Sequence, residues 1–176
     1  YTIKGGGYFL AAGALGRYVA SVDATEIALG AAVTLNPITA TYAVSVTGGP
    51  GSDSVTYNAT WNAYQTYDGG AGTDTIKISD TSTITSLNTG GLSNVEVVDI
   101  SAAQGASNLN LDFLPTVTTI KSSATSDAGG NTVTVSNMND DNSTVVINST
   151  NTAPEGIIGT RKLDNADDSV DLTVGI

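Results

Sequence analysis

The sequence predicts an all-β protein, and the architecture that fits it best is a parallel β-helix, or β-solenoid, with coils of about 21 residues. Three observations support this: a composition rich in strand and turn formers, short alternating apolar runs, and a glycine repeat of fixed period. The 176 residues include 26 Thr, 17 Ser, 14 Asn and 20 Gly. These residue types favour strands and turns over helices.

The glycine repeat is the most informative feature. Gly-Gly pairs begin at residues 48, 69 and 90, which gives two successive intervals of 21 residues. Seven positions after the start of each pair stand the β-branched residues Val55, Ile76 and Val97. A fixed period of this size is typical of solenoids, in which each coil stacks on its neighbour. We therefore expect these three residues to stack in adjacent parallel strands.

Short apolar runs extend this spacing in both directions, and many of them alternate with polar residues. Alternation indicates strands with one face inward and one outward. The expected strand centres are Val33, Val44, Val55, Ile76, Val97, Leu109, Val117, Val133, Val145 and Leu172. An antiparallel β-sandwich shows turn signals at similar intervals and remains the alternative fold. The strongest helix signal, over residues 8–19, is weakened by two internal glycines.

We expect residues 1–176 to form a single β-rich domain, or a fragment of a larger surface protein. Three regions are expected within it. Residues 1–47 form an N-terminal cap or assembly region, residues 48–150 the repeat region, and residues 151–176 a C-terminal strand region. The sequence contains no charge block and no separate linker that would divide the chain.

The composition excludes several function classes. The chain has no Cys and no His, which removes thiol and imidazole nucleophiles, Ser-His-Asp triads and thiolate or imidazole zinc sites. Six basic against 17 acidic residues give a net charge of -11, which repels nucleic acid and anionic lipid. No apolar run is long enough for a membrane-spanning helix. From the charge we therefore expect no nucleic acid as a partner, and from the run lengths no membrane insertion.

The sequence motif that predicts chemistry is a repeated glycine-aspartate loop. Residues 48–56 (GGPGSDSVT) and 69–77 (GGAGTDTIK) both match G-G-x-G-x-D-x-U-x, where U is a large apolar residue. Stacking one loop on the next places Asp53 over Asp74 and gathers carboxylate and carbonyl oxygens, the ligands that Ca²⁺ prefers. The expected metal-site residues are Gly48, Gly49, Gly51, Asp53, Gly69, Gly70, Gly72 and Asp74. The alternative interpretation is a pair of plain glycine turns capped by aspartate.

These two loops resemble the calcium-binding nonapeptide repeats of RTX proteins. The continuation through Asn94–Ile100 looks like the recurring unit of RTX-type bacterial surface-layer (S-layer) proteins, and the resemblance is closest over residues 40–150. It implies a type I secreted, extracellular protein that self-assembles on the cell surface in a calcium-dependent way. The sequence departs from the family in three ways: the spacing of 21 residues is longer than in an RTX β-roll, Val95 stands where the third loop should have Asp, and only two loops are intact where the family has long runs.

The aromatic residues leave three interpretations open. Tyr57, Trp61, Tyr64 and Tyr67 fall between the two glycine loops. They could pack over a coil edge, anchor a neighbouring subunit, or stack on sugar rings, which would make a cell-surface glycan a partner.

We expect a structural, non-catalytic protein whose partner is a further copy of itself, in an array or filament. An adhesin or extracellular filament subunit is the alternative. A β-helix polysaccharide-active enzyme is the rival class, with Asp99 and Asp112 as a conceivable carboxylate pair. Because the six basic residues are scattered along the sequence, an anionic sugar would find no cationic clamp, and we expect no enzyme activity.

Overall fold

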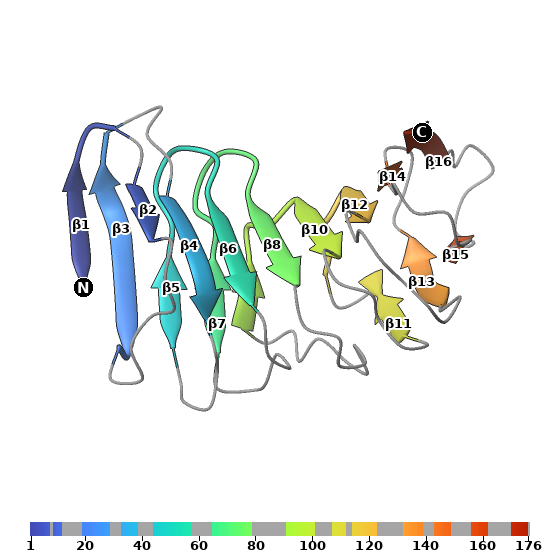
Figure 1. Cartoon of the computed structure of the whole chain (residues 1–176), viewed down its shortest axis with the longest axis horizontal. Coiled ribbons are helices and arrows are strands. Elements are labelled where there is room, and N and C mark those ends of the chain that lie inside the picture. Colours follow the sequence, from blue (N-terminus) through green and yellow to red (C-terminus); the bar gives the residue numbers. More distant parts are fainter. Residues whose placement is uncertain are drawn as a thin grey trace.

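The computed structural model places most of the described chain in β-strands (Figure 1). It describes residues 1–7, 9–11, 19–28, 33–38, 44–57, 65–78, 91–100, 107–111, 114–122, 132–138, 143–148, 156–161 and 170–175. Within these ranges the all-β class predicted from the sequence is confirmed. Residues 9–11, inside the weak helix signal, form a strand. None of the described residues belongs to a helix that is long and apolar enough to cross a membrane.

The strands form three sheets, which we call sheets A, B and C. Sheet A contains, in spatial order, β1 (Thr2–Gly5), β3 (Ser21–Ile27), β5 (Ser45–Thr47), β7 (Thr66–Asp68) and β9 (Leu92–Ser93). Sheet B runs from β2 (Phe9–Ala11) through β4 (Val33–Ile38), β6 (Ser54–Tyr57), β8 (Thr75–Ile78), β10 (Val97–Ile100), β12 (Thr119–Ser122) and β14 (Ser143–Asn148) to β16 (Val170–Gly175). Sheet C contains β11 (Ser107–Asn110), β13 (Thr132–Met138) and β15 (Gly156–Arg161).

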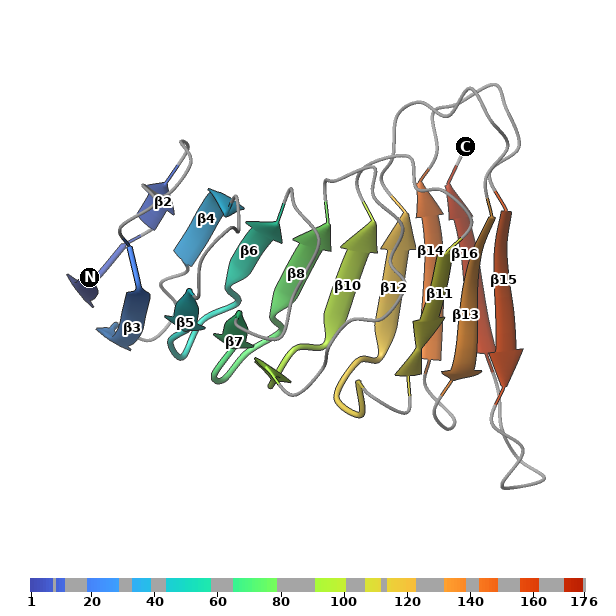
Figure 2. The ribbon, with the colours of Figure 1, turned by 90° about the horizontal axis from the view of Figure 1, so that it is seen from below.

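Successive strands alternate between the sheets, so hydrogen-bonded neighbours are every second strand along the chain. Figure 2 shows the strands of sheet B side by side in this order along the length of the molecule. All strand pairs between described residues are parallel. An antiparallel sandwich would pair Val55 and Ile76 in opposite directions, but these residues are partners in the parallel pair β6–β8.

The 21-residue spacing is the register of the sheets on either side of the glycine loops. In sheet A, Val46 pairs with Tyr67, and in sheet B, Val55 pairs with Ile76. The third member of the predicted column is wrong by one residue. Ile76 pairs with Val98, whereas Val97 pairs with Thr75. The chain between β8 and β10 is one residue longer than the preceding repeat, and a shift of one residue exchanges the two faces of a strand.

The core is formed by the inward-facing side chains of sheets A and B. In sheet B the inward column is Val55, Ile76, Val98 and Ile120, each no more than 1% exposed. In sheet A the inward positions include Val22, Val46 and Tyr67, and both columns belong to one hydrophobic cluster. Burial of each such side chain stabilises the fold by roughly 1.5–3 kcal/mol. This core fixes the loops that join sheet A to sheet B.

Candidate functional site

The two glycine-aspartate loops lie on top of each other, as the sequence predicts. The first joins β5 to β6 and the second joins β7 to β8. Register is kept on both sides, because Thr47 pairs with Asp68 before the loops and Ser54 pairs with Thr75 after them. Asp53 and Asp74 are thereby brought together, and the backbone N–H of Asp53 donates to Oδ1 of Asp74 at 2.7 Å.

Close stacking explains why the first residue of each loop is glycine. A Cβ on Gly48 would collide with the carbonyl oxygen of Gly69, and a Cβ on Gly69 would collide with the carbonyl oxygen of Asn94. Gly72 has a further requirement, since its φ of +133° lies in a region that L side chains rarely adopt. The glycines of the motif therefore set the distance between successive loops.

The carboxylate of Asp53 is buried and fully engaged by backbone donors. The side chain is 2% exposed. Its Oδ1 accepts the N–H of Val33 from the preceding sheet B strand, and its Oδ2 accepts the N–H of Gly49 from its own loop, both at 2.6 Å. One side chain thus ties its own turn to the neighbouring repeat.

Asp74 is engaged differently although its sequence motif is the same. It is 0% exposed, and its Oδ1 accepts the N–H of Asp53. The N–H equivalent to that of Gly49 belongs to Gly70, which donates instead to Oδ1 of Asp68 at 3.2 Å. Oδ2 of Asp74 is consequently buried without a hydrogen-bond partner. The two matches to one motif therefore provide two different electrostatic environments.

Two residues extend this row of acceptors, and the motif did not identify them. The N–H of Asp74 donates to Oε2 of Glu96 at 2.8 Å, and the N–H of Val95 donates to Oγ1 of Thr116 at 3.3 Å. Glu96 follows directly after Val95, the position where the motif lacks its aspartate. The 21-residue period itself would have found Thr116, since residues 53, 74, 95 and 116 are equally spaced.

A calcium ion held between the two loops would have to be surrounded by oxygen ligands. The ion takes roughly six to eight oxygen ligands, gathered from carboxylates, carbonyls and water. Here backbone N–H groups point at Asp53 and Asp74 from Val33, Gly49 and Asp53 itself. The described part of the chain has no group of three or more Asp or Glu residues arranged to hold a metal ion. The two oxygens of Asp53 and Oδ1 of Asp74 already accept backbone N–H groups, so in this arrangement the two carboxylates do not fit a calcium ion between them. The calcium site expected from the sequence stays a prediction.

The environment of Asp74 raises the pKa of its carboxyl group to about 6 from 3.8. Desolvation by burial is the main cause, the charges of Asp53, Glu96 and Asp68 add to it, and the hydrogen bond from Asp53 N–H opposes it. The folded state therefore favours the protonated form. The stabilisation from this proton is complete below the unfolded pKa and is lost as the pH rises through about 6.

We expect the free energy of unfolding to contain a component from Asp74 that grows as the pH falls from 7 to 5, by roughly 1 kcal/mol. Asp74→Asn should remove this component and leave the variant more stable than the wild type at pH 7. Urea titrations of both proteins across this pH range measure the difference. Parallel pH profiles for the two proteins would contradict the assignment.

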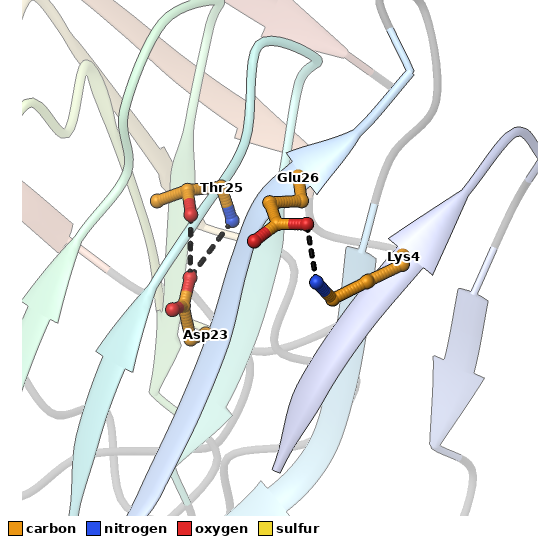
Figure 3. A network of polar contacts seen from close by, with 4 residues as sticks. All are labelled: Lys4, Asp23, Thr25 and Glu26. Carbon is orange, nitrogen blue, oxygen red and sulfur yellow. Dashed lines mark hydrogen bonds and ion pairs between the residues drawn. The ribbon is translucent and has the colours of Figure 1, made fainter.

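The carboxylates on the outer side of sheet A have a different role. Asp23 accepts the backbone N–H and the hydroxyl of Thr25, and Lys4 forms an exposed ion pair with Glu26 (Figure 3). Hydrogen bonds to Thr25 lower the pKa of Asp23. A shallow groove beside the loops includes Thr47, Asp68 and Asn94, and the Asn94 side chain donates to Asp68 at 2.8 Å. The Asp23 contacts lie within β3, the Lys4–Glu26 pair joins β1 to β3, and the Asn94 contact joins two successive repeats.

The remaining sequence-predicted residues are only partly described. Gly51 is buried in the first loop, with its carbonyl against Gly72. Tyr67 is 0% exposed in the core, so it packs inside rather than stacking on a sugar. Asp99 lies 3.8 Å from the Lys77 ammonium across sheet B. Trp61, Tyr64 and Asp112 lie outside the described residues, as does the side chain of Tyr57.

Comparison of the chain with protein-family models, with curated proteins and with solved structures gave no match.

Proposed function

We propose that the chain is a parallel β-solenoid with a structural role, secreted to the cell surface, where copies assemble into a layer of the S-layer type. The observation that supports this most directly is the register: parallel partners on both sides of the glycine loops stand 21 residues apart, at Val46–Tyr67 and Val55–Ile76. A solenoid is a regular rod, and rods of this kind are suited to building extended arrays.

The use of the acidic residues also favours a structural role over catalysis. A glycosidase needs two carboxylates that face a substrate across an open site. Wherever a carboxylate side chain is described, it has a structural partner instead. These partners are backbone or side-chain donors for Asp23, Asp53, Asp68, Asp74 and Glu96, and lysines for Glu26 and Asp99.

Calcium remains part of the proposal at the level of assembly. Copies that each carry a net charge of -11 repel one another, and a divalent cation lowers that repulsion. This contribution does not need a site between Asp53 and Asp74, since many of the acidic residues lie elsewhere in the chain.

Electron microscopy of the purified chain tests this function. Samples are compared in millimolar calcium, in chelator, and in sodium chloride matched for ionic strength. We expect two-dimensional arrays in calcium, and fewer or none in the other two buffers. Filaments instead of sheets would favour the alternative of a filament subunit. Dispersed particles under all three conditions, or cleavage of a polysaccharide panel, would overturn the proposal.

A further inference from the structure

The hydrogen bonds of the glycine-aspartate loops run in a fixed direction. At Val33, Asp53 and Asp74, a backbone N–H donates forward to a carboxylate one repeat ahead, which belongs to Asp53, Asp74 and Glu96 respectively. In the opposite direction, the N–H of Thr75 donates back to the carbonyl of Asp53, and the N–H of Val97 donates back to the carbonyl of Asp74. Adjacent repeats are thus joined from both sides at the point where sheet B begins.

This row of acceptors continues after the motif has ended. No aspartate is present at position 95, yet the carboxylate of the next residue, Glu96, accepts the N–H of Asp74. One repeat further on, the acceptor is the neutral hydroxyl of Thr116, which accepts the N–H of Val95 and donates to its carbonyl at 2.8 Å. What Asp53, Asp74, Glu96 and Thr116 have in common is a side-chain oxygen that accepts a backbone N–H of the preceding repeat. Negative charge, which calcium would require, is not kept.

We propose that Asp53, Asp74, Glu96 and Thr116 form a metal-independent acceptor ladder, which holds the successive loops in register in the place that calcium occupies in the repeats this sequence resembles. A buried backbone N–H without an acceptor is costly, so each side chain stabilises the repeat that precedes it. The ladder concerns the folding of one chain. Its test does not depend on whether copies of the chain assemble into a layer.

The first experiment uses the unmodified protein. Amide hydrogen exchange is followed by NMR in chelator and in millimolar calcium, with magnesium as a control for charge screening. The ladder predicts that the amides of Val33, Asp53 and Asp74 are equally protected in all three buffers. Protection of these amides that appears only in calcium would overturn the proposal and restore a metal site.

The second experiment separates an acceptor from a charge. Glu96→Gln keeps an oxygen acceptor for the Asp74 amide but loses the negative charge, whereas Glu96→Ala loses both. We expect Glu96→Ala to speed exchange of the Asp74 amide by about tenfold or more, and Glu96→Gln to leave it near the wild-type rate. The amide of Gly69, which donates to the Ser93 carbonyl, is the internal reference.

Glu26→Ala, which removes an exposed carboxylate in sheet A, is the matched control and should leave the Asp74 amide unchanged. Equal exchange rates in Glu96→Ala and the wild type would refute the ladder. So would equal acceleration in Glu96→Gln and Glu96→Ala, because charge rather than hydrogen bonding would then be responsible. If Glu96→Ala does not fold, the comparison of buffers with the unmodified protein still decides the question.

Discussion

Gly69→Ala is expected to lower the free energy of unfolding by about 3 kcal/mol or more, enough to leave much of the protein unfolded. The added methyl group would overlap the carbonyl oxygen of Asn94 and the Cβ and Cγ atoms of Asp74. Relief by backbone movement would stretch the hydrogen bond from the Gly69 N–H to the Ser93 carbonyl, now 3.0 Å. The loops would then separate and the bond between Asp53 and Asp74 would weaken.

Gly6→Ala is the control for this substitution. A Cβ at Gly6 would meet only the Cβ of Ala28, at an ordinary contact distance of 3.7 Å. The same chemical change should therefore have little effect there. Circular dichroism melts of the two variants measure the contrast, and similar melting temperatures would show that the loops are not tightly stacked at Gly69.

Asp53→Ala is expected to destabilise the protein by about 4 kcal/mol, since it leaves two buried amides without an acceptor. These are the N–H groups of Val33 and Gly49, each 2.6 Å from a carboxylate oxygen. The stability of Asp53→Asn should fall between that of the alanine variant and that of the wild type. Its single carbonyl oxygen can accept a hydrogen bond from only one of the two N–H groups, while its NH₂ group faces the other donor.

Asp23→Ala serves as the comparison for Asp53. Asp23 also accepts two donors, from the backbone and the hydroxyl of Thr25, but water can replace it at this exposed position. Its loss should change the denaturation midpoint little. Chemical denaturation of the three variants tests this order of stability. An Asp53→Ala protein as stable as Asp23→Ala would mean that the buried carboxylate is not the acceptor that ties the repeats together.

Many of the strands could be predicted because the alternation of apolar and polar side chains and the 21-residue period indicate the same strand positions. Val33, Val55, Ile76, Leu109 and Val145 all lie within strands, close to their expected places. The strand β7 was missed because its three residues contain one apolar side chain, Tyr67, between Thr66 and Asp68. The strand β15 was missed because its glycines interrupt the apolar pattern.

The stacking of Asp53 on Asp74 could also be predicted, because equal loop lengths carry one register from sheet A into sheet B. The use of the carboxylates could not. Whether a loop aims carbonyls or N–H groups at an aspartate depends on backbone orientation, and both arrangements are compatible with the same glycine pattern. The pairing of Val98 rather than Val97 with Ile76 could not be predicted either, because the two adjacent valines are chemically identical and both are buried.

The order of the strands along the molecule also governs how it would bear mechanical load. In Figures 1 and 2 the strands of sheet B lie across the long dimension, one after another from β2 to β16. Tension along that dimension pulls directly on the hydrogen bonds between neighbouring strands, and every strand pair in the series carries the same force, so the sheet would open at its weakest pair. Tension parallel to the strands loads all the bonds of a pair together in shear. We therefore expect the molecule to open at a lower force when it is pulled lengthwise than when it is pulled along its strands, and an array would resist stretching best along the strand direction.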